Sequence, residues 1–153
     1  MFKPSFTILS LVVAAGMAAP LDATKSAGRA PVRVAAIGTD YAFIDFPATI
    51  AAGPTEFSFE NRGKVRHEMS MVLLRPGVTM QQVLERGPSA ASSKAMSEQI
   101  IGILIARPGE SAGGRLSVDL QSGRRYLVVC TLKDTPDDKP HVMLGMVASF
   151  DVP

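Results

Sequence analysis

The feature that most constrains this chain is the placement of its rarest side chains. Among 153 residues, one is cysteine and two are histidine. Cys130 and His141 lie near the C-terminus, followed by Met146, whereas His67 lies far upstream. Thiolate, imidazole and thioether groups are ligands for soft and borderline transition metals. A fold that brings His67 to the C-terminal segment would therefore create a metal site.

Each of these side chains also has a purely structural interpretation. A single histidine in a strand commonly serves packing, and a single buried cysteine behaves as a small hydrophobic residue. The eight methionines can fill a core. The combination is more specific, because one Cys, two His and a nearby Met form the donor set of a mononuclear copper site. Met146 is the preferred weak fourth ligand, and Met143 is its competitor.

The N-terminal segment predicts export. Lys3 precedes an apolar run over residues 6–15, which is followed by small residues. This run has the length of a signal-peptide core and is short for a bilayer-spanning helix. We predict a signal peptide over residues 1–19, with cleavage between positions 18 and 23, and a flexible linker over residues 20–30. An uncleaved anchor is the alternative.

Export affects the interpretation of Cys130. A periplasmic or extracellular protein, with no stable membrane insertion after cleavage, would hold this cysteine in an oxidising compartment. A chain with one cysteine cannot form an internal disulfide. The thiol therefore needs burial, an interchain partner or a bound metal, and a metal-bound thiolate satisfies this requirement.

The composition argues against two classes of function. A net charge of +2, without a basic stripe interleaved with aromatic residues, gives no basis for nucleic-acid binding. A Cys–His pair is present, but no nucleophile elbow or comparable acyl-transfer motif accompanies it. Two histidines are also too few for a multicopper centre. We therefore expect a protein that is not an enzyme.

Turn residues divide residues 31–153 into short segments of strand-like composition. The chain contains 13 glycines and 11 prolines, which favour turns over long helices. Predicted strands cover residues 32–44, 55–60, 65–74, 100–105, 115–120, 126–132 and 144–152. The continuously apolar run 100–105 is expected to be buried. Such a series is typical of an all-β sandwich.

Two local patterns refine this prediction. Thr79 is expected to cap a short helix that ends near Gly87, which would be a helical insertion between strands. In the predicted strand 65–74, alternation directs His67 to the apolar side and Glu68 to the opposite side. Glu68 is therefore not expected to be a ligand beside His67.

Three motifs resemble the cupredoxin family of blue (type 1) copper proteins, which includes plastocyanin and azurin. They are Asn61-x-Gly63-x-x-x-His67, Gly123-x-x-Tyr126-x-x-x-Cys130, and His141-x-x-x-Gly145-Met146. The resemblance implies a Greek-key β-sandwich that binds one copper ion, cycling between Cu(I) and Cu(II). It assigns the ligands as His67, Cys130, His141 and Met146.

The resemblance also implies how such a protein would work. Electrons would pass through an exposed His141 to a transient redox-protein partner. Three neighbouring residues would form an apolar docking patch around it: Val142, Met143 and Leu144. Such a contact would be small and short-lived.

The segment between Cys130 and His141 departs from the family pattern. It holds ten residues (TLKDTPDDKP), more than typical blue-copper loops. A looser site is expected from it, and its aspartates, at positions 134, 137 and 138, are expected to be solvated turn residues. Two alternatives stay open. One is a metal-free binding domain of the same fold. The other is a Cu(I) carrier or copper-resistance protein that exchanges copper with a donor or acceptor.

Overall fold

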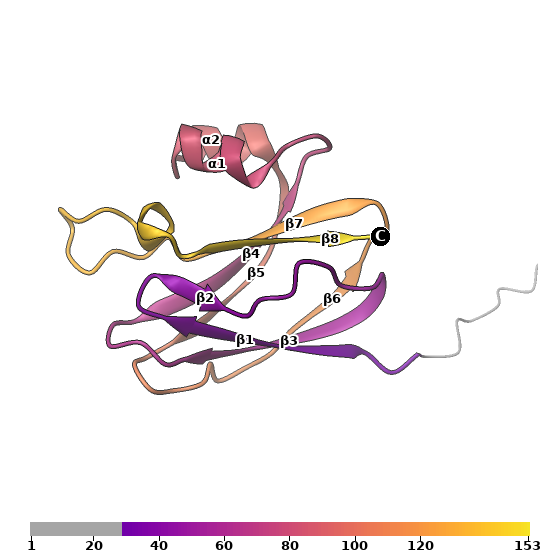
Figure 1. Ribbon diagram of the computed structural model, residues 1–153, viewed down its shortest axis with the longest axis horizontal. Helices are drawn as coiled ribbons and strands as arrows, with labels where there is room; N and C mark the ends of the chain where they lie inside the picture. The colour runs from indigo at the N-terminus through magenta and orange to yellow at the C-terminus, as the bar shows by residue number, and fades with distance from the viewer. Residues whose placement is uncertain (1–28) are drawn as a thin grey trace, which may run out of the picture.

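The computed structural model describes residues 29–153 as two β-sheets packed face to face (Figure 1). The predicted signal peptide and most of the predicted linker lie outside these residues. The first sheet has the order β2-β1-β3-β6 and the second has the order β5-β4-β7-β8. The strands of the first sheet are β1 (Val32–Thr39), β2 (Ala42–Ile44), β3 (Gly53–Asn61) and β6 (Leu116–Leu120). Those of the second are β4 (His67–Leu74), β5 (Ser97–Ala106), β7 (Arg124–Val129) and β8 (Val147–Val152).

The topology explains how distant parts of the chain meet. β1 pairs in parallel with β3, and the other strand pairs are antiparallel. β4 lies between β5 and β7, so the strand that starts at His67 is adjacent to the strand that leads to Cys130. The chain crosses between the two sheets several times. This arrangement confirms the predicted all-β sandwich.

Alternating side chains of both sheets form the core. In β3 every second residue is buried, including Phe57 and Phe59, as expected for a strand with one face in the core. The Tyr126 and Phe150 rings of β7 and β8 stack with centroids 5.2 Å apart. The Phe150 ring also lies 6.0 Å from the Phe57 ring of β3, so aromatic contacts join the two sheets in the core.

The prediction of a buried strand at 100–105 is wrong. This run lies in β5, which is an edge strand of the second sheet. Leu104 points into the core and is 8% exposed, whereas Ile103 and Ile105 are each 51% exposed. An edge strand that packs on one face only leaves its alternate side chains in solvent. A continuous apolar run does not reveal this difference.

Two short helices cover part of the outer face of the second sheet. They are α1 (Met80–Arg86) and α2 (Ala90–Met96). Thr79 caps α1 in a reciprocal capping box with Gln82, and Gly87 ends the helix, which confirms the predicted insertion. No helix within residues 29–153 is long and apolar enough to cross a membrane.

The predicted ends of the last two strands are also corrected. β7 ends at Val129, so Cys130 is the first residue beyond it. The predicted strand at 144–152 starts only at Val147, because a 3-10 helix, η1 (His141–Leu144), precedes it. Gly145 has a φ of 115° and ends η1 in a conformation that glycine adopts without steric cost.

Candidate metal centre

Three side chains converge at one end of the sandwich. His67 Nδ1 lies 3.1 Å from His141 Nδ1, and Cys130 Sγ lies 3.3 Å from His141 Nδ1 and 3.9 Å from His67 Nδ1. All three residues are completely buried. The fold therefore brings together the three predicted ligands, with Sγ of Cys130 and the Nδ1 atoms of both imidazoles facing one another.

The loop between β3 and β4 fixes the position of His67. The buried Asn61 side chain donates to the carbonyl groups of Val65 (2.8 Å) and Ala106 (3.1 Å) and accepts from the Gly63 N–H (2.8 Å). Asn61 thus holds both the loop and the neighbouring end of β5. A Cβ atom on Gly63 would lie 2.9 Å from His67 Nε2, so only glycine fits behind the imidazole. These contacts give the Asn61–Gly63–His67 motif a physical basis.

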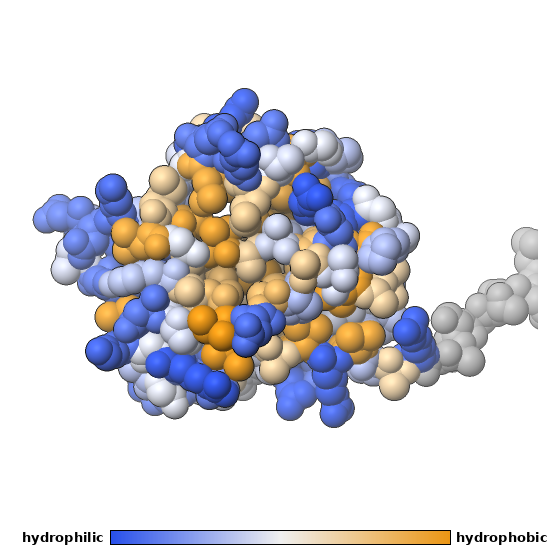
Figure 2. Space-filling model, in the orientation of Figure 1, coloured by the Kyte–Doolittle hydropathy of each residue, from blue (hydrophilic) through white to orange (hydrophobic). Residues whose placement is uncertain are grey.

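Backbone hydrogen bonds close the base of the ten-residue loop. The His141 N–H donates to the Leu132 carbonyl (2.8 Å), and the Val142 N–H donates to the Cys130 carbonyl (2.7 Å). The loop extends away from the sandwich, and its exposed tip is hydrophilic (Figures 1 and 2). These bonds hold Cys130 and His141 close together at the base of the loop, although ten residues separate them.

The methionines occupy different environments. Met146 is fully buried, and its N–H donates to the His141 carbonyl while its carbonyl accepts from Cys130. Its terminal methyl group packs over Gly38 of β1, where a Cβ atom would lie 2.9 Å away. Met143 is 41% exposed and lines a cavity under the helices. Met146 is therefore the methionine that the backbone connects to Cys130 and His141.

The residues expected to form a docking patch are also divided. Leu144 and Met143 are 45% and 41% exposed, whereas Val142 is buried and only 3% exposed. Val142 packs in a cluster with Leu74, Leu127 and Val129. An exposed apolar surface at this end thus contains Met143 and Leu144 and lacks Val142.

The outer edges of the two imidazoles face carboxylates. His141 Nε2 lies 3.1 Å from Asp134 Oδ1, and His67 Nε2 lies 3.5 Å from Asp40 Oδ1. The expectation that His141 is exposed is wrong, because Asp134 and Tyr41 cover it. Asp134 lies in an exposed bend of the loop, as expected, but its carboxylate also bonds to His141 and Tyr41. Asp138 is a turn residue that accepts from the backbone N–H of Thr135. Sequence reasoning missed Asp134, Asp40 and Tyr41 as parts of the site.

Hydrogen bonding indicates the protonation of the imidazoles. Asp134 accepts from Nε2–H of His141, which leaves Nδ1 of His141 as a lone pair. Within residues 29–153, His67 Nε2 is the one buried side-chain nitrogen or oxygen without a hydrogen-bond partner. The two Nδ1 atoms lie 3.1 Å apart, where two nitrogen lone pairs would repel each other. The contact is therefore favourable only with a proton on His67 Nδ1 or with a cation shared between the two nitrogens.

Burial affects the acid–base behaviour of the cluster. It raises the pKa of the Cys130 thiol, and the backbone N–H of Glu68, 3.4 Å from Sγ, acts in the opposite direction. Burial also lowers the pKa of His67, and His141 contributes to this shift while Asp40 opposes it. In the absence of a metal, burial therefore favours a neutral imidazole at His67 and a protonated thiol at Cys130.

The arrangement fits a transition-metal ion. Metal bonds of about 2.0 Å to nitrogen and about 2.3 Å to sulfur, at trigonal angles, keep ligand atoms roughly 3.5–3.7 Å apart. The observed separations of 3.1, 3.3 and 3.9 Å bracket this range. A cation at the centre would accept both Nδ1 lone pairs and replace the thiol proton of Cys130. Two imidazoles and one thiolate in a trigonal arrangement match copper.

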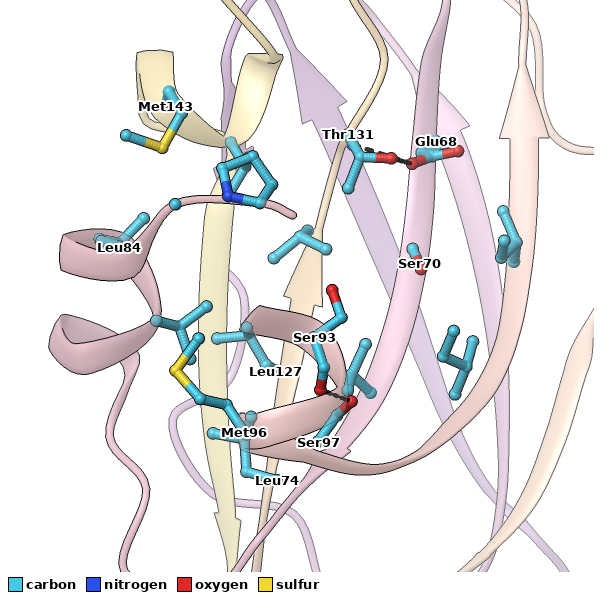
Figure 3. Close-up of a pocket in the computed structure, with 18 residues that line it drawn as sticks. Glu68, Ser70, Leu74, Leu84, Ser93, Met96, Ser97, Leu127, Thr131 and Met143 are labelled. Carbon is cyan, nitrogen blue, oxygen red and sulfur yellow. Dashed lines mark hydrogen bonds between the residues drawn. The ribbon is translucent and has the colours of Figure 1, made fainter. Parts of the chain in front are cut away.

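A separate cavity lies on the opposite face of the second sheet. It has a volume of about 270 Å³ and lies between the helices and the strands β4, β5 and β7 (Figure 3). Its lining is mostly apolar, and Glu68 lies at one side, where its Oε1 accepts from the N–H and hydroxyl of Thr131 (2.8 and 2.7 Å). Glu68 therefore faces away from His67, as alternation predicts, and it holds the residue that follows Cys130.

Comparisons with known proteins identify the fold. No family model matches the sequence, and no curated protein sequence matches it. Among solved structures, the dithionite-reduced auracyanin of the photosynthetic bacterium Roseiflexus castenholzii is 16% identical, with a TM-score of 0.52 over 82% of this chain and 99% of that chain. Auracyanin B is 18% identical, with a TM-score of 0.56 over 82% of this chain and 92% of that chain.

A third similar structure is auracyanin A, a "blue" copper protein from the green thermophilic photosynthetic bacterium Chloroflexus aurantiacus. It is 21% identical, with a TM-score of 0.51 over 81% of this chain and all (100%) of that chain. These similarities show that the chain has the cupredoxin fold, as its sequence motifs predict. At such identities they establish the fold alone.

Proposed function

We propose that this protein is an exported mononuclear copper protein that transfers electrons. The observation that carries the proposal is the convergence of one thiol and two imidazole Nδ1 atoms, all within 4.8 Å of one another and buried at one end of a cupredoxin fold. His67, Cys130 and His141 would hold the ion, and Met146 would be a weak fourth ligand. Copper would supply a one-electron Cu(I)/Cu(II) couple.

For this function the protein would supply ligands that are held rigidly and a site from which water is excluded. His67 is fixed by the loop that Asn61 holds, and His141 is fixed by its backbone bonds and by Asp134. Ligands that are held in place by buried contacts move little when the charge of the site changes. Little movement favours rapid electron exchange, which is the task of an electron carrier.

The donor set supports electron transfer over copper carriage. One thiolate and two imidazoles with a single weak thioether differ from a sulfur-rich Cu(I) site. Of the other methionines, Met143 lines the cavity under the helices. A transient redox partner would meet the surface formed by Met143 and Leu144. The signal peptide over residues 1–19 and the linker over 20–30 are part of the proposal.

The test is titration of the purified, reduced protein with Cu(II), followed by absorption and EPR spectroscopy. We expect a thiolate-to-copper charge-transfer band that saturates at one copper per chain. Cys130→Ser abolishes the band, whereas Met143→Ala retains it and Met146→Ala changes its energy. Absence of any such band, with Cys130 still reactive toward thiol reagents after unfolding, would overturn the proposal.

A further inference from the structure

The outer edge of His141 is closed by two side chains from other parts of the chain. Asp134, in the ten-residue loop, accepts from His141 Nε2 through Oδ1 at 3.1 Å. Its Oδ2 accepts from the Tyr41 hydroxyl, so the carboxylate bridges the phenol and the imidazole. The His141 side chain is 1% exposed and that of Asp134 is 30% exposed. Asp134 therefore separates the imidazole from solvent.

Tyr41 reaches this position from a strained turn. It has a φ of 64° in the two-residue turn between β1 and β2, in the left-handed region that a bulky residue rarely adopts. Its ring meets those of His141 and His67 edge-on, with centroids 5.0 and 6.2 Å away. Such strain is unfavourable and tends to occur at functional sites. This backbone feature supports a role for the Tyr41–Asp134 pair independently of the hydrogen bond.

We propose that Asp134, anchored by Tyr41, is a positioning residue that holds the proton of His141 on Nε2, directs Nδ1 to the metal and lowers the reduction potential of the site. The inference rests on the proposed copper function. A carboxylate that accepts from an imidazole N–H increases the electron donation of the opposite nitrogen. Greater donation and a nearby negative charge both stabilise Cu(II) relative to Cu(I), which lowers the potential.

The first arm of the test needs no copper. In the metal-free protein, long-range ¹H–¹⁵N NMR correlation reports which nitrogen of His141 is protonated. We expect the Nε2–H form in wild type and in Asp137→Asn, which removes an exposed charge from the same loop. In Asp134→Ala the Nε2–H signal is lost by mixing of tautomers or rapid exchange. A wild-type Nδ1–H form, or an unchanged spectrum in Asp134→Ala, would overturn the inference.

The second arm measures the copper-loaded protein. Asp134→Asn keeps an acceptor and removes the charge, so the reduction potential rises. Asp134→Ala removes both, so the potential rises further and Cu(II) affinity falls about 10- to 100-fold. Tyr41→Phe releases the carboxylate and shifts the potential in the same direction by less, whereas Asp137→Asn leaves the potential unchanged.

The two arms separate this inference from the proposed function. If copper produces no thiolate band but the His141 proton depends on Asp134, the copper function is wrong and the positioning role stands. If copper binds and the potential of Asp134→Ala equals that of wild type and of Asp137→Asn, the tuning role is wrong and the copper function stands.

Discussion

At the scale of single residues, the site depends on the missing side chain at position 63. A Cβ atom there would overlap Asp40 Oδ1 and approach His67 Nε2 to 2.9 Å. The same carboxylate oxygen accepts from the Lys64 N–H at 2.7 Å, which joins the turn between β1 and β2 to the loop before β4. Gly63 thus lets the two segments that frame His67 approach each other.

Substituting Gly63→Ala tests this close approach. We expect a loss of about 1–3 kcal/mol in the free energy of unfolding, because the added methyl group must displace the imidazole or the Asp40 turn. Weaker copper binding accompanies it. Gly113→Ala is the matched control, since a Cβ atom there meets nothing within 4 Å; its effect stays within about 0.5 kcal/mol. Urea unfolding of both variants checks the prediction, and equal stabilities would contradict it.

The buried His67 also predicts a pH dependence for the metal-free protein. Its pKa in the folded protein is lowered, chiefly by burial, whereas the unfolded chain takes up the proton near the ordinary value of 6.5. The unfolded state therefore binds more protons below that value, so the stabilising contribution is complete above pH 6.5 and is lost as pH falls toward the folded pKa. Urea unfolding between pH 7.5 and 5 measures this loss. In His67→Gln the free energy of unfolding should change less with pH in this window. An identical slope in both proteins would show that His67 is not the source of the pH dependence.

The residues missed from sequence show why a site is harder to predict than its ligands. Cysteine and histidine are rare in this chain, so the sequence alone indicates Cys130 and His141 as candidate ligands. Tyr41 and Asp134 are ordinary residues separated by 93 positions, and their contact exists only after folding. Asp134 was one of three aspartates in a polar loop, and no local pattern distinguishes it from Asp137 or Asp138.

At the scale of elements, the sequence predicts where strands form better than it predicts which of their faces are buried. Alternation of polar and apolar residues in β3 and β4 identifies the faces that pack in the main core, although the other face of β4 is also largely buried. The apolar run in β5 gives no such information, since its position at the edge of the second sheet depends on the order of all the strands. η1 (His141–Leu144) was missed because its four residues carry no helical pattern, and the apolar Leu144 was assigned to the strand that follows. Gly145 and the loop base determine its conformation instead.

Adjacent residues of β5 provide a test of this edge position. Leu104→Ala removes a core side chain and is expected to cost about 2–5 kcal/mol. Ile105→Ala removes a similar number of atoms from a side chain that is 51% exposed, so its cost stays below about 1 kcal/mol. Chemical denaturation of the two variants gives both values. Comparable losses would mean that the outer face of β5 is covered in solution.

At the scale of the whole molecule, the site is a product of folding. His67 and Cys130 are 63 positions apart, and they meet only because β4 and β7 pair in the second sheet. The first sheet contributes the turn that carries Asp40 and Tyr41. An unfolded chain offers no preformed site, so the binding free energy of a metal adds to the stability of the fold.

This linkage predicts how copper changes unfolding. With free Cu(II) at 100 times its dissociation constant, the free energy of unfolding of wild type rises by about 2.7 kcal/mol, and each further tenfold excess adds about 1.4 kcal/mol. Urea unfolding in oxygen-free buffer at several copper concentrations measures this slope. Cys130→Ser loses most of the gain because the thiolate dominates binding, whereas Met143→Ala keeps it, since Met143 lies outside the cluster. Equal copper-dependent gains in wild type and Cys130→Ser would mean that the ion binds elsewhere, and the fold would then serve a function without a metal at this site.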